Sequence, residues 1–591
     1  MSARVLRSPI SGRVFLPAVG RASLVLVLLA ALAAQALFAA LATSATDDEP
    51  YYVVSGLSAL LTGDYRLSVD HPPLMPMVCG AAAYLAGAAP IPRNQDWAAA
   101  LRLKYSYFYL WKGANAPKAV RLVTAARLPV IALSLALALL VFVWARQLYG
   151  WRAALLPLVL YCFEPNIIAH SSVATLDLGL AAAFSFALYA FWRFLGTRRW
   201  VYLVLTGIAL GAAAAVKLPG LLLLVVLPVL ASIRASADPR AAPGESSLEV
   251  ARSGGWRTIL PYFAAILGIA LVSLWAVYRF GLGPLSLVPG AARMPLGQYW
   301  QAISFQVGHQ QMGHPAYLLG QTSAAGWWYY YPLAFLVKTP LPLLILLGLA
   351  FSRSGAGLKP VLPRSELFLV VPAAIFLLFT MAQKLDLGIR YLLPIYPLLI
   401  ILTGRTLAGR SKLLPNGAAG GRPRWMSAAV MALAVWAVAE ALLYSPHYLA
   451  YFNELAGGPS HGTRVLVDSN LDWGQDLKRL AAWQRAHPTA SPLHFAYFGP
   501  ANVALYGVKC ERLPDLGPKD PPRPPEWYFT ETRPRPGWIA ISVNCLKLIP
   551  AYGWLESYRP VDHAGYSIAI YHIPALSGPA QAGVGAPSPG R

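Results

Sequence analysis

Long runs of apolar residues recur along most of the first 443 positions of the chain. A helix needs about 20 predominantly apolar residues to cross a membrane. The first run, residues 22–46, contains no charged side chain. Further runs cover residues 128–145, 153–170, 172–192, 201–216, 218–233, 258–278, 332–351, 366–383, 390–404 and 425–443. The pattern predicts a polytopic α-helical membrane protein with about 11 transmembrane helices.

Two apolar segments need a separate interpretation. Residues 74–91 are apolar, but Pro72, Pro73 and Pro76 stand at their start, so we predict an interfacial helix that lies on the membrane. The run 22–46 follows a basic leader and resembles a signal peptide. It is longer than a usual signal core of about 7–15 residues, which favours an uncleaved anchor.

The composition supports membrane insertion. Of the 591 residues, 57% are hydrophobic and only 12% are charged, whereas a soluble domain has about 25% charged residues. A soluble multidomain enzyme and a disordered chain are both excluded on this ground.

The formal net charge of +23 has two explanations, nucleic-acid binding or the orientation of membrane helices. Most basic residues of the membrane region fall in alternate loops, which is the cytoplasmic excess of the positive-inside rule. One segment disagrees: residues 93–127 hold about seven Lys and Arg, yet this topology puts them outside. The later loops outweigh it, and no nucleic-acid partner is expected.

The loops on the opposite side are long and chemically mixed. We predict a transmembrane module over residues 1–443 whose outer loop 47–127 is catalytic. Residues 444–578 are proline-rich and contain strand-like runs at 538–543 and 566–573, which predicts an extracytoplasmic α+β domain. Residues 579–591 are expected to be a disordered tail.

Ionisable side chains collect at the outer ends of the predicted helices, where charge at membrane depth suggests either function or a tight structural pair. Taken singly, each is more often a solvated boundary residue; together, with both signs present, they indicate a polar cavity. Cations there could hold a phosphate, and a carboxylate could accept a proton. Glu49, Asp70 and His309 are available as metal ligands. No nucleotide-binding loop or nucleophile elbow is present in the sequence.

Several short motifs resemble those of GT-C glycosyltransferases, and more narrowly the protein O-mannosyltransferase-like family (glycosyltransferase family 39), which is related to the bacterial lipid A aminoarabinose transferases. The matching segments are Asp48-Glu49-Pro50-Tyr51-Tyr52, Asp70-His71-Pro72-Pro73-Leu74, Glu164 to Asp177, Val216-Lys217, Gly308-His309 and Arg390-Tyr391. A later motif, Asp468 to Asp476, resembles a tail found in many bacterial members.

The resemblance implies an inverting transfer of a sugar from a polyprenyl-phosphate donor. It implies that Asp48 is the general base, with Glu49 beside it as a second catalytic residue. Donor phosphate and substrate contacts are expected from Tyr52, His71, Asp177, Lys217, Arg390 and Tyr391. Asp70 and His309 match positions that can hold a divalent metal ion in relatives, and the metal requirement stays open. Histidine is only partly charged near neutral pH, and the aminoarabinose transferases have lysine where this chain has His71.

The sequence therefore predicts a glycosyltransferase of the cell membrane, the inner membrane if the cell is bacterial. Its active site and C-terminal domain would face the outside or periplasm. The expected partners are the lipid bilayer, a polyprenyl-phosphate sugar and a protein, lipid or glycan acceptor. A transporter or flippase of lipid-linked sugars is the alternative, although transporters place their sites near the midplane and often contain repeats. An anchored binding protein that acts through its tail is a third hypothesis.

Overall fold

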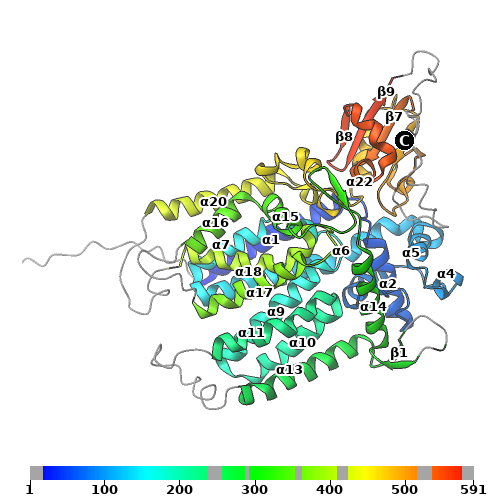
Figure 1. The fold of residues 1–591 in the computed structure, drawn as a ribbon. Coiled ribbons are helices and arrows are strands. Elements are labelled where there is room, and N and C mark those ends of the chain that lie inside the picture. Colours follow the sequence, from blue (N-terminus) through cyan, green and yellow to red (C-terminus); the bar gives the residue numbers. More distant parts are fainter. Residues whose placement is uncertain are drawn as a thin grey trace, which may run out of the picture.

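The computed structural model describes residues 18–235, 256–285, 290, 292–352, 363–408, 424–515 and 535–574. Within them, most of the chain up to residue 443 is helical, and strands concentrate toward the C-terminus. Long helices lie side by side in a bundle, and the C-terminal strands cover one end of it (Figure 1). The predicted fold class, a helical membrane protein with several apolar helices and a C-terminal region containing strands, is confirmed. The predicted tail 579–591 lies outside the described residues.

The bundle contains six described helices that are long and apolar enough to cross a membrane. They are α1 (Ala18–Ala42), α6 (Ala119–Tyr149), α9 (Asp177–Thr197), α13 (Trp256–Val277), α17 (Arg364–Met381) and α20 (Arg424–Leu443). Two bent pairs raise the number to as many as eight. The predicted count of about 11 is therefore not confirmed.

The bends explain part of that difference. The predicted span 153–170 consists of α7 (Trp151–Cys162) and α8 (Pro165–Ser171), which meet at 60°. The Glu164 carboxylate accepts a hydrogen bond from Ile167 N at 2.6 Å and starts the second helix afresh. The predicted span 332–351 consists of α15 (Tyr330–Lys338) and α16 (Leu341–Ser352), bent by 111°. Hydropathy measures apolar length and is blind to such bends.

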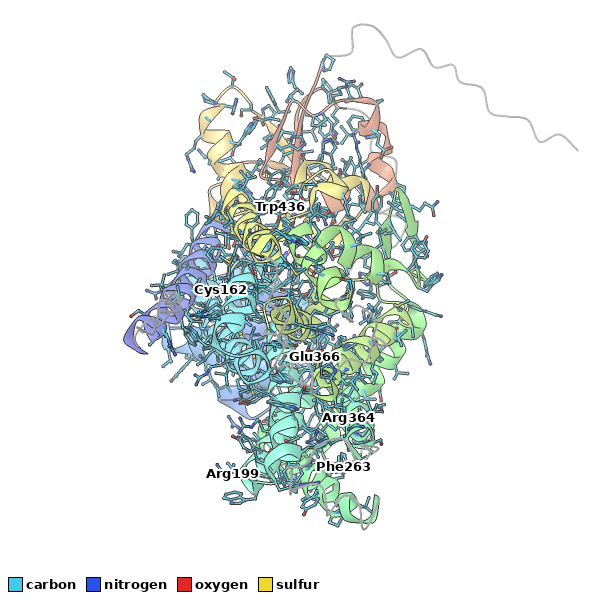
Figure 2. All side chains as sticks on the ribbon, turned by 90° about the vertical axis from the view of Figure 1, so that its left-hand side faces the viewer. Cys162, Arg199, Phe263, Arg364, Glu366 and Trp436 are labelled. Carbon is cyan, nitrogen blue, oxygen red and sulfur yellow. The ribbon has the colours of Figure 1, made fainter. Side chains whose placement is uncertain are left out.

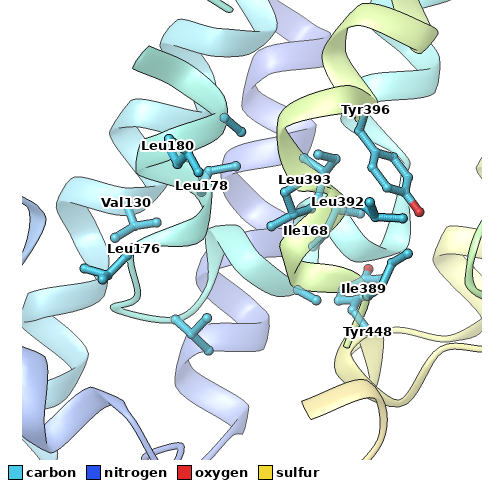
Figure 3. Close-up of a cluster of buried hydrophobic side chains, with 14 of the residues drawn as sticks. Val130, Ile168, Leu176, Leu178, Leu180, Ile389, Leu392, Leu393, Tyr396 and Tyr448 are labelled. Atoms are coloured by element: carbon cyan, nitrogen blue, oxygen red, sulfur yellow. The ribbon is translucent and has the colours of Figure 1, made fainter. Parts of the chain in front are cut away.

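Three predicted segments form shorter helices. Residues 201–216 lie in α10 (Trp200–Val216), and 218–233 lie in a 3-10 turn followed by α11 (Leu223–Ala235). Residues 390–404 form the 3-10 helix η4 (Ile389–Ile395) and α18 (Tyr396–Thr403). Apolar side chains from α8, α9, η4 and α18 pack together where these elements meet (Figure 3).

Two short helices in the first loop cross at very close range. They are α2 (Glu49–Thr62) and α3 (Leu74–Leu85), and α3 has only 12 residues. A Cβ atom added at Gly56 would lie 1.8 Å from Pro76 O, and one at Gly80 would lie 2.4 Å from Leu57 N. Only glycine permits this contact, which fixes α2 and the loop before it.

The same end of the bundle carries α5 (Arg102–Trp111) and α14 (Gly297–Met312) (Figure 1). The C-terminal region contributes α21 (Leu477–Ala486), α22 (Val543–Leu548) and a five-stranded mixed sheet in the order β6-β5-β7-β9-β8. The strands are β5 (Leu493–Ala496), β6 (Glu511–Arg512), β7 (Gly537–Ser542), β8 (Asp562–Ala564) and β9 (Ile568–Ile573). The strand-like runs noted in the sequence correspond to β7 and β9.

The opposite end of the bundle holds a separate ion pair. Arg405 Nη1 lies 3.1 Å from Glu366 Oε2, and both side chains are buried. Figure 2 turns this end toward the viewer and labels Glu366 beside Arg364 at the start of α17. Charged groups therefore gather at both ends of the bundle, and only one of these ends carries the C-terminal sheet.

Candidate functional site

An ion pair joins the first loop to a turn 342 residues later. Asp48 immediately precedes α2, and Arg390 lies in η4. Arg390 Nη1 donates a hydrogen bond of 2.6 Å to Asp48 Oδ2, while Arg390 Nε donates to Leu387 O at 3.1 Å. The Asp48 side chain is 26% exposed and that of Arg390 is 10% exposed. Among the described residues, no donor contacts Asp48 Oδ1, so one oxygen of this carboxylate has no protein hydrogen bond.

A second ion pair lies next to the first. Lys217 follows the last residue of α10, and Asp177 is the first residue of α9. Lys217 Nζ lies 2.7 Å from Asp177 Oδ1, and it also lies 3.8 Å from the centre of the Tyr391 ring. The helix termini favour these charges, since a carboxylate suits a helix N-terminus and an ammonium a C-terminus. Tyr391 directly follows Arg390, so the same turn carries one cation, Arg390, and contacts the other, Lys217.

Glu49 has a different environment from its neighbour Asp48. Its Oε1 accepts hydrogen bonds from Arg127 Nε at 2.7 Å and Ala174 N at 2.8 Å. Its Oε2 accepts from Arg127 Nη2 at 2.6 Å and Thr46 N at 2.8 Å. The carboxylate is 0% exposed, and the Arg127 side chain is 1% exposed. Both oxygens are therefore fully occupied by fixed donors.

The loop between α2 and α3 brings a third group of side chains to the same place. The Tyr51 hydroxyl donates a hydrogen bond to Asp70, whose other oxygen lies 3.6 Å from Arg102 Nη1. The rings of Tyr52 and His71 lie 5.9 Å apart. Burial lowers the pKa of His71 to about 4, against the opposing charge of Asp70. At neutral pH the imidazole is uncharged, so it offers a hydrogen bond rather than a positive charge.

The predicted metal ligands are only partly assembled. Gln306 in α14 donates a hydrogen bond to the backbone oxygen of Asp70 at 2.9 Å, which holds the helix that carries His309 against this loop. His309 Nε2 lies 3.4 Å from His314 Nδ1. No group of three or more His, Cys, Asp or Glu side chains suited to a metal occurs among the residues that the structure describes.

A cavity of about 140 Å³ opens beside Asp48. Its walls come from the first loop and α2, from α5 and from the C-terminal region. The lining residues are Asp47, Asp48, Pro50, Tyr51, Leu103, Ser106, Tyr107 and Pro500. Burial and the nearby charge of Asp48 raise the pKa of Asp47 to about 7. A small cavity with both polar and apolar walls therefore lies next to Asp48.

Sequence reasoning missed two side chains at this site. Arg127 counted only as one of the basic residues of segment 93–127, although its position next to a predicted span was a signal of a buried partner. The other is Trp473, whose ring lies 4.4 Å from Arg390 Cζ. Its motif was noticed in the sequence, but no local pattern connects residue 473 to residue 390.

Comparison with known proteins finds one matching family model. Residues 62–236 match the dolichyl-phosphate-mannose-protein mannosyltransferase family. The match includes Asp70, His71, Asp177 and Lys217, and it excludes Asp48 and Arg390. No curated protein sequence matches the chain significantly.

Solved structures give more distant similarities. ArnT from Cupriavidus metallidurans in the apo state has 15% sequence identity and a TM-score of 0.45, covering 93% of this chain and 98% of that one. The S. cerevisiae protein O-mannosyltransferase Pmt1-Pmt2 complex bound to the sugar donor has 11% identity and a TM-score of 0.49, covering 73% of this chain and 90% of that one. The predicted resemblance to the protein O-mannosyltransferase-like family is thus confirmed, and the family model carries it over residues 62–236.

Proposed function

We propose that this chain is a membrane glycosyltransferase that moves a sugar from a polyprenyl-phosphate donor to a protein, lipid or glycan acceptor. One observation carries the proposal: a half-satisfied carboxylate, Asp48, borders a cavity and lies beside two buried cations, Arg390 and Lys217. Sugar transfer from a phosphate needs a base on one side of the reacting carbon and positive charge on the other.

Asp48 is the proposed general base. As the acceptor hydroxyl attacks the anomeric carbon, its proton passes to the Asp48 carboxylate and a new carbon–oxygen bond forms. The bond from the anomeric carbon to the phosphate oxygen breaks, and the carrier phosphate leaves with the bonding electrons. Attack from the side opposite to the phosphate inverts the anomeric configuration.

Arg390 and Lys217 are proposed to stabilise the departing phosphate. The leaving oxygen gains negative charge as its bond breaks, and charge-assisted hydrogen bonds from buried cations stabilise that charge. Asp177 holds the Lys217 ammonium in place, and the Tyr391 ring lies under it. Tyr52 and His71 complete the proposed donor site, with His71 contributing a neutral hydrogen bond.

Glu49 is proposed to act by positioning rather than by proton transfer. Both of its oxygens are engaged by Arg127 and by backbone amides at residues 46 and 174. These bonds tie the start of α2 to α6 and to the loop before α9. Asp48 is the preceding residue, so the same bonds hold its backbone.

The proposed orientation places this site outside the cell membrane, in the periplasm of a bacterium. The alternation of basic loops supports it. The donor would enter from the bilayer with its lipid between helices. We retain the proposed division into a transmembrane module, residues 1–443, and an extracytoplasmic domain, residues 444–578.

The test is sugar transfer by purified Asp48→Asn protein supplied with several polyprenyl-phosphate sugars and candidate acceptors, with released carrier phosphate as the readout. Removal of a general base lowers turnover by about 10²- to 10⁴-fold, and we expect kcat to fall in this range when it is measured well below the melting temperature of the variant, which loses the partner of the buried Arg390. Near-normal turnover would reject Asp48 as the base.

A matched control for this test is Asp96→Asn. Asp96 forms a partly exposed ion pair with Lys104 at 3.1 Å on the same face of the molecule. This variant should keep native turnover, because a partly exposed pair contributes little.

A further inference from the structure

The segment of residues 468–477 lies between the two loops that carry Asp48 and Arg390. On one side it pairs with the first loop: Ser44 N donates to Gln475 O, and Asp47 N donates to Trp473 O, both at 2.9 Å. On the other side, Asn470 Oδ1 accepts from Ile389 N at 2.9 Å, and Ser469 Oγ donates to Leu387 O at 2.7 Å. One stretch of the C-terminal region therefore hydrogen-bonds to both loops that carry the Asp48–Arg390 pair.

Trp473 is the residue of this segment that reaches the Arg390 side chain. Its ring centre lies 4.4 Å from Arg390 Cζ, and the ring of His170 lies edge-on at 6.0 Å. The residue is 2% exposed. Its backbone is held as well, because its N–H donates to Gln475 Oε1 at 2.7 Å and its carbonyl accepts from Asp47. The indole is thus a rigid surface.

A guanidinium group needs more than hydrogen bonds to be held in one orientation. The bonds to Asp48 and to Leu387 O fix two of its nitrogens, but rotation about the line between them would still tilt its plane. A planar cation packs against an aromatic face, and in a desolvated place this contact is worth up to about 2 kcal/mol. The Trp473 ring supplies such a face.

We propose that Trp473 is a positioning residue whose ring fixes the plane of the Arg390 guanidinium. In that plane Nη1 contacts Asp48, Nε contacts Leu387 O, and the N–H groups that have no acceptor among the described residues face the donor phosphate. This inference rests on the proposed function and gives the C-terminal region a direct part in it. Trp473 itself touches neither base nor phosphate in this scheme. It acts through Arg390.

The experiment measures two quantities on purified full-length protein: affinity for undecaprenyl phosphate, and kcat for sugar transfer. The variants are Trp473→Leu, Trp473→Phe, Arg390→Lys and the Trp473→Leu/Arg390→Lys double variant. We expect Trp473→Leu to lower both quantities roughly 10-fold. Trp473→Phe keeps an aromatic face and should recover most of the loss.

The double variant separates positioning from a general structural effect. If Trp473 acts through Arg390, Trp473→Leu should have little further effect once Arg390 is lysine, because the ammonium has no plane to orient. Equal losses in both backgrounds would overturn the inference. So would an equal loss of function in Trp473→Phe and Trp473→Leu.

Trp483→Leu is the matched control. Trp483 is also a buried tryptophan of the C-terminal region, but it stacks on His487 and donates to Asp562, away from Arg390. It should lower the melting temperature without changing carrier-phosphate affinity. A loss of affinity equal to that of Trp473→Leu would overturn the inference.

The binding measurement also distinguishes this inference from the proposed function. If Trp473 and Arg390 are coupled in carrier-phosphate binding but no donor is turned over, transferase activity is rejected and the positioning role stands. If transfer proceeds and the coupling is absent, the positioning role alone is rejected. If the native protein does not bind undecaprenyl phosphate, both are rejected.

Discussion

Two carboxylates that are neighbours in the sequence, Asp48 and Glu49, lie in opposite environments. Asp48 has one charged partner, keeps an oxygen without a protein donor and borders a cavity. Glu49 has four hydrogen bonds and no exposed surface. The difference teaches that charge alone does not mark a reactive group. A reactive carboxylate must be held in place and still be incompletely satisfied.

The largest effect is expected from breaking the buried Glu49–Arg127 ion pair. Glu49→Gln leaves Arg127 buried with an uncompensated charge, and removal of one partner of a buried ion pair costs about 3–5 kcal/mol. We expect a large fall in the melting temperature of the purified protein, with kcat of the folded fraction reduced far less than in Asp48→Asn.

The reverse outcome would contradict this assignment. A Glu49→Gln protein that melts like the native one but has lost transfer would mean that Glu49 takes part in the chemistry. Measuring both variants at one temperature, below either melting point, keeps stability and activity separate.

A smaller effect is expected from replacing Lys217, the second cation near Asp48. Lys217→Met removes the ammonium that we assign to the phosphate, and a hydrogen bond to a charged group is worth about 1.5–3 kcal/mol. Affinity for undecaprenyl phosphate should fall by roughly 10- to 100-fold. The matched control is Lys104→Met, which removes a partly exposed lysine of α5 that pairs with Asp96. Equal binding losses in the two variants would indicate a general charge effect.

The smallest expected effect is a change in stability per unit of pH, caused by a buried carboxyl group in the C-terminal region. Asp472 accepts hydrogen bonds from Gly474 N and Asn544 N, yet burial raises its pKa to about 8. Because this folded-state pKa exceeds the unfolded value near 4, the folded protein binds more protons between these limits. Its stability therefore falls as pH rises from about 4 to 8, by at most about 1.4 kcal/mol per unit.

Asp472→Asn should flatten that dependence. The measurement is the melting temperature of native and variant proteins from pH 5 to 8, with Asp562→Asn, at an exposed position of strand β8, as the control. An unchanged slope in Asp472→Asn would show that another group is responsible. Asp47, whose pKa is raised to about 7, is the next to replace.

The sequence predicted which charged residues gather at one end of the bundle better than it predicted how they pair. Each span end that carried a charge was visible, because apolar runs stop where polar side chains begin. Asp48, Asp177, Lys217 and Arg390 could therefore be assigned to one side, and the structure brings them into two adjacent ion pairs. The pairing itself depends on helix packing, which one-dimensional hydropathy does not contain.

Other features had no local signal. The difference between Asp48 and Glu49 arises from Arg127, 78 residues beyond Glu49, and the orientation of Arg390 depends on a ring 83 residues further along the chain. The bend between α15 and α16 does not show in hydropathy, since both halves are apolar, although Pro340 and Pro342 mark a helix break there. The strands β7 and β9 could be predicted because short runs rich in isoleucine and aromatic residues are a local property of the sequence.

The distances along the chain between paired charges also imply an order of assembly. The two residues of the Glu49–Arg127 pair are 78 positions apart in the chain. Asp48 pairs with Arg390, which is synthesised 342 residues later, and the segment around Trp473 follows after that. Because synthesis proceeds from the N-terminus, the scaffold pair can form while most of the protein is still unmade. The Asp48 carboxylate thus lacks its ion-pair partner until most of the chain has been made. If the chain acts as the proposed transferase, it becomes catalytically competent late in its biogenesis.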